Sequence, residues 1–195
     1  MNEQERQARR ARKHRRRRNT VIGFMVLSVG LAWFFESQST TTIIIARHAE
    51  ENQLGGRDPG LSQAGRARAE QLAIALKDID VITGLDAIFI HPNKLSRETV
   101  LPVSMNTDAP VHSGNNPDKP EKLVSRMLRK YEGKIILLVV EAEYIQPLIA
   151  EMQGSKKLPE IADDEYDNLF IVTIPWFGKV KTLRLSYGDR YKPEA

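Results

Sequence analysis

Arg47 and His48 stand side by side directly after an apolar segment rich in β-branched residues. An imidazole can act as a nucleophile or as an acid–base group, and a guanidinium binds the oxygens of an anion such as phosphate. The chain has four histidines and no cysteine, which excludes disulfides, thiolate metal sites and a cysteine nucleophile. We expect neither a metal ion nor a cofactor. An Arg-His pair alone is a weak motif, so its meaning depends on the elements that position it.

The chain after residue 40 alternates between strand patterns and helix patterns. Short apolar runs predict buried strands at residues 41–46, 87–90 and 134–140. Helical patterns lie between and after them, at residues 62–77, 95–103, 121–131 and 144–152. Residues 169–175 and 180–185 alternate around Trp176-Phe177-Gly178 and predict a terminal hairpin. The alternation predicts an α/β domain of three layers, a mainly parallel sheet flanked by helices.

In such sheets, functional side chains gather beyond the carboxyl ends of the strands. Arg47 and His48 leave the first predicted strand at that edge, and Glu141 and Ala142 leave the 134–140 strand there. We therefore expect these two strands to be neighbours, with the four side chains close together.

Residues 43–73, IIIARHAEENQLGGRDPGLSQAGRARAEQLA, strongly resemble the histidine phosphatase superfamily, the phosphoglycerate-mutase-like phosphatases. That family has Arg-His-Gly/Ala-Glu at the end of its first strand, followed by a helix start of the form Leu-Ser/Thr-x-x-Gly. The likeness continues through KIILLVV, Pro147 and DDEYDNLFIVTIP, and so covers about residues 41–190. It implies a phosphoglycerate-mutase-like fold for this part of the chain.

The resemblance also implies roles. In this family a neutral imidazole attacks a phosphoryl group, and water hydrolyses the resulting phosphohistidine. Two arginines and a second histidine clamp the phosphoryl oxygens, and a carboxylic acid protonates the leaving group. By match to the motif, His48 is the nucleophile and Arg47 the first clamp. Glu50 matches the family glutamate, as a catalytic group or as a partner that orients Arg47; Asp118 and Glu51 are further candidates for the acid.

The second clamp arginine is missing. In HPNKLSRETV, residues 91–100, Thr99 aligns with the family threonine, so that Leu95 stands where the arginine belongs. His91 replaces a small hydroxyl residue. Arg97 is close in sequence, but helical spacing turns it away from position 95.

The second histidine is missing as well. In VVEAEYIQP, residues 139–147, Ala142 stands in its place, flanked by Glu141 and Glu143. Loss of two phosphoryl-binding groups and gain of two carboxylates turn an anion clamp into a neutral or acidic pocket.

Three hypotheses follow. The first is a degenerate member that binds a phosphorylated small molecule or a protein partner with weak or no turnover. The second is an active phosphomonoesterase that forms a phosphohistidine at His48, helped by His91 or Arg97. The third is a site for a cation or an amine, formed by Glu141 and Glu143.

The positive charge of the chain is confined to its start. Residues 1–18 hold nine cations and two glutamates, a net charge of +7, whereas the whole chain carries +4. The remaining residues therefore carry −3, and we do not expect the body to bind nucleic acid.

Residues 21–35 are uncharged and mostly apolar. We predict a transmembrane signal anchor over residues 19–36, preceded by a basic cytoplasmic tail (1–18) and followed by a linker (37–42). The domain would then lie outside the cytoplasm, in the periplasm of a bacterium. Alternatives are a signal peptide cleaved near Ser37-x-Ser39 and a buried helix behind a nucleic-acid-binding arm.

Overall fold

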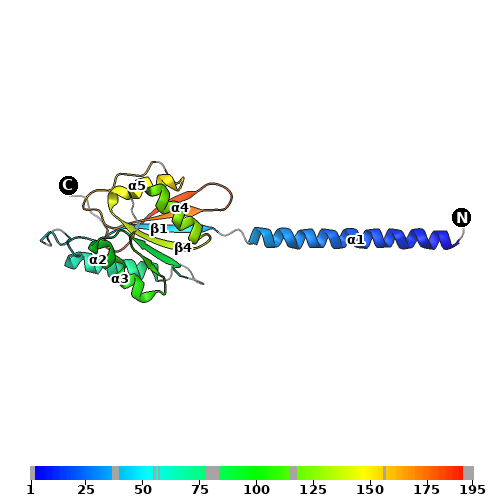
Figure 1. Ribbon diagram of the computed structural model, residues 1–195, viewed down its shortest axis with the longest axis horizontal. Coiled ribbons are helices and arrows are strands. Elements are labelled where there is room, and N and C mark those ends of the chain that lie inside the picture. Colours follow the sequence, from blue (N-terminus) through cyan, green and yellow to red (C-terminus); the bar gives the residue numbers. More distant parts are fainter. Residues whose placement is uncertain are drawn as a thin grey trace. The chain divides into compact units, whose positions relative to one another are not determined.

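The computed structural model describes residues 3–36, 40–54, 56, 58–77, 84–114, 118–155 and 157–190. The chain divides into two compact units, residues 1–38 and residues 39–195. The first unit contains one helix, and the second is a layered α/β domain (Figure 1).

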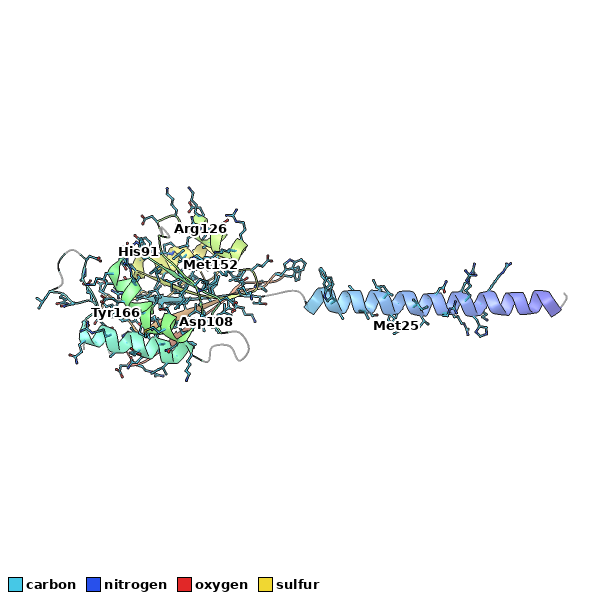
Figure 2. All side chains as sticks on the ribbon, turned by 60° about the horizontal axis from the view of Figure 1, so that its bottom comes forward. Met25, His91, Asp108, Arg126, Met152 and Tyr166 are labelled. Atoms are coloured by element: carbon cyan, nitrogen blue, oxygen red, sulfur yellow. The ribbon has the colours of Figure 1, made fainter. Side chains whose placement is uncertain are left out.

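The N-terminal helix, α1 (Glu3–Glu36), runs without a break through both the basic segment and the apolar segment. Apolar side chains from Val21 to Phe34 are exposed along it, and Met25 projects from the helix in Figure 2. Over the described residues, no helix combines the length and apolar character needed to cross a bilayer. The helix predicted at residues 19–36 is thus present, and its placement in a membrane stays a prediction.

The predicted linker needs a correction at its carboxyl end. Thr41 and Thr42 belong to the first strand, where backbone pairing on both sides holds them. Residues 37–39 of the predicted linker lie outside the described residues.

The domain is built on one sheet of six strands in the order β3-β2-β4-β1-β5-β6. The strands are β1 (Thr41–Arg47), β2 (Ala87–Ile90), β3 (Val111–His112), β4 (Ile135–Val140), β5 (Asn168–Ile174) and β6 (Lys181–Ser186). β1 to β4 pair in parallel, whereas β5 runs antiparallel to β1 and β6 antiparallel to β5. The sheet is therefore mixed, with the predicted parallel part and the predicted terminal hairpin. The two-residue strand β3 was not predicted, because so short a segment has no periodicity.

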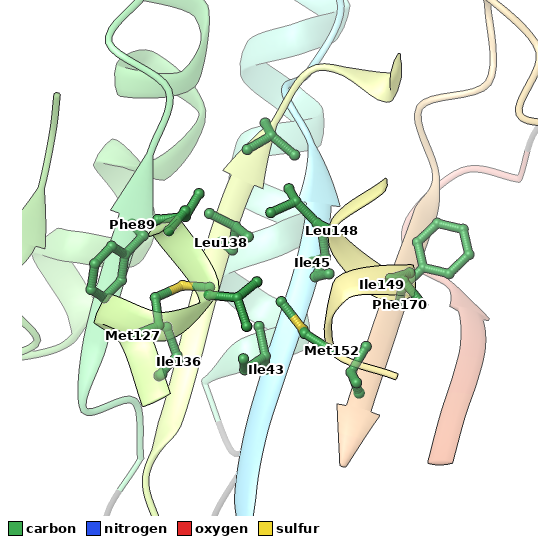
Figure 3. Close-up of a cluster of buried hydrophobic side chains, with 14 of the residues drawn as sticks. Ile43, Ile45, Phe89, Met127, Ile136, Leu138, Leu148, Ile149, Met152 and Phe170 are labelled. Atoms are coloured by element: carbon green, nitrogen blue, oxygen red, sulfur yellow. The ribbon is translucent and has the colours of Figure 1, made fainter. Parts of the chain in front are cut away.

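Helices cover both faces of the sheet, so the predicted three layers are confirmed (Figure 1). The helices are α2 (Gln63–Leu76), α3 (Lys94–Asn106), α4 (Pro120–Lys130) and α5 (Ala142–Glu151). Along β1, Ile43 and Ile45 pack with residues of α4 and α5 (Figure 3). Ile44 and Ala46, on the opposite face, pack with residues of α2 and α3. A strand buried on both faces needs a continuous apolar sequence, which is what residues 43–46 provide.

The start of α2 shows why the Leu-Ser-x-x-Gly pattern is needed. Ser62 caps the helix, because its hydroxyl accepts the Gly65 backbone N–H at 3.0 Å. A Cβ on Gly65 would lie 2.2 Å from the Glu50 carbonyl oxygen. Only glycine allows the first turn of α2 to approach the chain that follows His48.

Candidate active site

Three strand ends meet at one edge of the sheet. Arg47 pairs in register with Val140, and the His48 backbone N–H donates to the Val140 carbonyl at 3.1 Å. The His91 backbone N–H donates to Val139 at 3.0 Å, which brings in the end of β2. The expected proximity of Arg47-His48 to Glu141-Ala142 is confirmed.

His48 is buried and has a defined tautomer. The residue is only 7% exposed, and its Nδ1 lies 2.9 Å from the Ala49 carbonyl oxygen. A carbonyl can only accept, so Nδ1 carries the proton and Nε2 keeps its lone pair. Burial lowers the pKa of His48; the Ala49 hydrogen bond opposes this effect, and the charge of Arg47 adds to it. A neutral imidazole with a free Nε2 is the form that a nucleophile requires.

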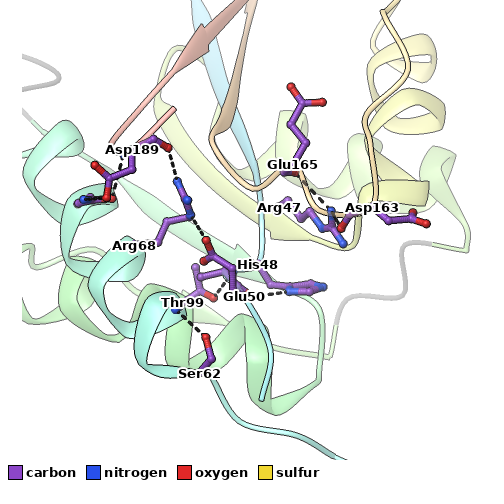
Figure 4. Close-up of polar contacts among 12 residues, drawn as sticks. Arg47, His48, Glu50, Ser62, Arg68, Thr99, Asp163, Glu165 and Asp189 are labelled. Atoms are coloured by element: carbon purple, nitrogen blue, oxygen red, sulfur yellow. Dashed lines mark hydrogen bonds and ion pairs between the residues drawn. The ribbon is translucent and has the colours of Figure 1, made fainter. Parts of the chain in front are cut away.

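Thr99 holds the chain at His48 in place. Its hydroxyl accepts the Ala49 backbone N–H at 2.9 Å and donates to the Leu95 carbonyl at 2.8 Å. The side chain is fully buried. The threonine of the family pattern therefore joins the loop after β1 to the first turn of α3 (Figure 4).

Arg47 is bound by the protein itself. Its Nη1 donates to the carbonyl oxygens of Ala162 (3.2 Å), Asp163 (2.7 Å) and Glu165 (3.3 Å). The guanidinium also lies over the Tyr166 ring, 4.0 Å from its centroid, and Nε is buried without a partner. Figure 4 shows Arg47 directed toward this segment. One nitrogen of the predicted phosphate clamp is thus occupied by backbone carbonyls of the segment before β5.

Glu50 pairs with an arginine of α2, and its role as a partner that orients Arg47 stays a prediction. Its Oε1 accepts from Arg68 Nε of α2 at 2.6 Å, and Arg68 Nη1 donates to the Asp189 carbonyl at 3.2 Å. The ion pair ties the loop after β1 to α2 and to the chain after β6, as Figure 4 shows. Sequence reasoning missed it because Arg68 and Asp189 come from distant segments.

The two positions that are predicted to be degenerate have different surroundings. Leu95 is 6% exposed and packs in a small apolar cluster with Ala49, Leu61 and Ala69. Ala142 is half-buried at the first residue of α5, two residues before the predicted helix start. The second clamp position is therefore filled by hydrocarbon. Arg97 is exposed on α3, as helical spacing predicted.

A polar cluster adjoins His48 at the ends of β2 and β4. Glu141 Oε1 accepts from His91 Nδ1 and from Asn93 Nδ2, both at 3.0 Å. Asn93 Oδ1 in turn caps α3 by accepting the Ser96 backbone N–H at 2.8 Å. Sequence reasoning missed Asn93, although an asparagine just before a helical pattern is a recognisable cap. The Glu141 carboxylate is also close enough to act on the charge of His48.

Two tyrosines were missed as well. A hydrogen bond to Asp118 raises the pKa of Tyr144, with burial and a bond to Glu143 adding to the shift. Asp118, a candidate acid, is thus engaged with the first turn of α5. Burial raises the pKa of Tyr166, which the neighbouring charge of Arg47 opposes. Nothing in the local pattern distinguished these residues from core aromatics.

Beside Ala142 lies a cleft of about 230 Å³, between the first turn of α5 and the segment around residue 160. Its lining mixes acidic and apolar side chains, including Glu143, Leu158 and Asp163. Among the residues described, no group of three or more His, Asp or Glu side chains could hold a metal ion.

No family model and no curated protein matches this sequence. Solved structures do. The protein histidine phosphatase SixA, complexed with tungstate, aligns with a TM-score of 0.60 and 16% identity over 74% of this chain and 96% of SixA. YhfR of Bacillus stearothermophilus aligns with a TM-score of 0.54 and 16% identity, over 68% and 90% of the two chains. A mycobacterial glucosyl-3-phosphoglycerate phosphatase aligns with a TM-score of 0.54 and 13% identity, over 69% and 90%.

The domain has the histidine phosphatase fold. At these identities the likeness concerns the fold, and the site must be judged on its own residues. At the predicted nucleophile position this chain has His48, whose Nδ1 is bonded to a carbonyl. It keeps the arginine at position 47 but binds it to backbone carbonyls, and it has hydrocarbon at positions 95 and 142.

Proposed function

We propose that this protein is a membrane-anchored, histidine-phosphatase-like protein whose domain binds a ligand or a protein partner with weak or no phosphatase turnover. The observation that carries the proposal is the engagement of Arg47 Nη1 with three backbone carbonyls. A phosphoryl group at His48 Nε2 would have to compete for this guanidinium, with Leu95 and Ala142 offering no replacement.

The expected loss of rate from the missing anion-binding groups favours weak or absent catalysis. Removal of one group that stabilises a developing anion typically costs about 10²–10³ in rate. Here two such positions are apolar, and the carboxylate of Glu141 lies near the nucleophile. The losses need not add, but together they leave His48 without the clamp on which phosphoryl transfer depends.

The anchor is supported by the composition and length of α1. Residues 19–36, as helix, extend about 27 Å, close to the roughly 30 Å of a bilayer core. Its one hydroxyl at the basic end, Thr20, donates to the Arg16 carbonyl at 3.0 Å, which reduces the cost of placing it at a membrane boundary. The basic residues before the segment would keep that end in the cytoplasm, and the domain outside it.

A second candidate function is an active phosphomonoesterase that forms a phosphohistidine. The neutral, Nδ1-protonated imidazole of His48 favours it, because Nε2 is free to attack. Under this hypothesis His91 or Arg97 must move to replace the missing clamp.

Turnover of p-nitrophenyl phosphate by the full chain in detergent tests the proposal. We expect the unmodified protein and His48→Ala to be indistinguishable. His112→Ala, a histidine of β3 that contacts Tyr131, is the matched control for loss of an imidazole elsewhere. Turnover of about 1 s⁻¹ or faster, lost in His48→Ala and kept in His112→Ala, would establish the active phosphatase instead.

A further inference from the structure

The turn between β5 and β6 carries a cluster of exposed aromatic and basic residues. We define the hairpin tip as residues 175–181, PWFGKVK, which contain no acidic residue. Trp176 is 57% exposed and Phe177 is 87% exposed. Gly178 has φ +114°, which allows the chain to reverse there and leaves both rings at the end of the turn.

The hairpin tip lies at the end of the sheet where β1 begins. Thr41, the first residue of β1, pairs with Ile174, the last residue of β5. A groove of about 430 Å³ adjoins it and is lined by Thr41, Trp176 and Arg129 among others. The aromatic rings and the start of β1 therefore lie at the same end of the sheet.

Cations lie near the rings, and the groove beside Trp176 also contains one carboxylate, that of Glu132. Lys179 and Lys181 belong to the tip itself and are exposed. Arg129 and Lys130 close α4 just before β4 begins. An exposed tryptophan and phenylalanine next to lysines and arginines are the residue types that bind the boundary of an anionic bilayer, because the rings enter the headgroup layer and the cations pair with lipid phosphates.

We propose that the hairpin tip binds the surface of the anionic membrane in which α1 is anchored. The proposal rests on the proposed function for the anchor. Only four residues separate α1 from β1, a reach of about 14 Å at full extension, so an anchored α1 would keep the start of β1 within about that distance of the carboxyl end of the anchor. This contact would turn the opposite end of the sheet, with His48, away from the membrane by about 20 Å, the length of a strand such as β1.

The consequence concerns the ligand. A site held that far from the surface faces solute or a protein partner, and the headgroups of the same bilayer cannot reach it. The hairpin tip thus narrows the class of ligand without contributing a residue to the site.

The sequence has two tryptophans, which allows a direct test. In the full chain, Trp33→Phe leaves Trp176 as the sole emitter. The chain is reconstituted in vesicles of phosphatidylcholine with or without phosphatidylglycerol, each containing a lipid brominated near the headgroup. We expect blue-shifted and quenched Trp176 emission in the phosphatidylglycerol vesicles. Lys179→Glu with Lys181→Glu should abolish the quenching. Leu54→Ser is the control: it removes a side chain that is 95% exposed beyond the other end of β1, and it should leave the quenching unchanged.

Co-flotation of the chain with the vesicles separates the two proposals. A chain that floats with unquenched Trp176 overturns the hairpin-tip proposal and leaves the anchor intact. A chain that neither floats nor is quenched overturns both. Equal quenching in the two kinds of vesicle overturns the role of lipid charge, and a blue shift that depends on protein concentration in detergent would assign the tip to contacts between copies of the chain.

Discussion

Burial sets the protonation state of His48. The imidazole is buried directly after β1, with Nδ1 bonded to the Ala49 carbonyl, and the loss of hydration lowers its pKa below the ordinary value of 6.5. The unfolded chain therefore binds a proton on this residue at pH values where the folded chain does not. The contribution of His48 to the free energy of unfolding is therefore fully present above pH 6.5. It decreases as the pH falls from 6.5 toward the pKa of the folded state.

Replacement of this imidazole should make the domain less sensitive to acid. In His48→Gln the decline in unfolding free energy below pH 6.5 should be smaller than in the unmodified protein, by up to about 1.4 kcal/mol per pH unit for one proton. Urea unfolding at pH 7.5 and at pH 5.5 measures both slopes. His112 also has a lowered pKa, but it is present in both proteins and cancels. Equal slopes would mean that His48 is protonated alike in both states.

Positions 95 and 142, which are predicted to be degenerate, should tolerate the family residues differently. Leu95→Arg places a guanidinium in an apolar cluster with Ala49 and Leu61, and should destabilise the domain by about 3 kcal/mol or more. Ala142→His adds a ring at a half-buried helix start, and should cost less than about 1 kcal/mol. Urea unfolding of each variant provides the comparison. An arginine at position 95 that folds as well as leucine would show that this position can still open toward His48.

At the scale of elements, a hydroxyl of α3 bonds the loop after β1 at Ala49. Thr99→Val keeps the shape of the side chain but leaves the buried Ala49 N–H without an acceptor. We expect a loss of about 1–3 kcal/mol in unfolding free energy. Thr99→Ser retains the hydroxyl and is the control. Thermal unfolding of the two variants distinguishes the hydrogen bond from the packing of a methyl group, and equal losses would assign the effect to packing.

Helices and strands could be predicted where a single short segment contains the whole pattern that defines the element. The run 43–46 is apolar on both faces, and Ser62 with Gly65 marks a helix start, so β1 and α2 were predicted to within a residue or two. β3 was missed because two residues carry no period. The start of α5 was missed because Ala142 and Glu143 gave no apolar signal.

Contacts of the site were harder to predict than its position. The strand ends brought Arg47, His48 and Glu141 together as expected. The partners of Arg47, however, are carbonyls of residues 162–165, more than 100 residues away. A backbone carbonyl has no sequence signal, so no pattern could show that the guanidinium is already bound. The Arg68 partner of Glu50 was missed for a similar reason, since an exposed-looking helix cation has many potential partners.

At the scale of the molecule, the domain and α1 are separate units with opposite net charge. If α1 is an anchor with its basic end in the cytoplasm, a reporter fused after Ala195 should be active only outside the cytoplasm. The full chain should also remain in the membrane fraction after a high-salt wash. Substitution of the arginines at positions 15–18 with glutamate should lower the proportion of correctly oriented chains. Activity of a cytoplasmic reporter at the same fusion point would contradict this topology.

The central claim is that the pocket at His48 no longer clamps an oxyanion, and titration with tungstate, the anion bound in the SixA structure, tests it most directly. Calorimetry on the full chain in detergent should detect no binding tighter than about 1 mM, because Arg47 Nη1 is bound to carbonyls and Leu95 and Ala142 stand where the second arginine and histidine are expected. Arg47→Ala should then give the same result. A dissociation constant near 1 μM, equivalent to about −8 kcal/mol, that is lost in Arg47→Ala would show that the clamp is intact and contradict the account.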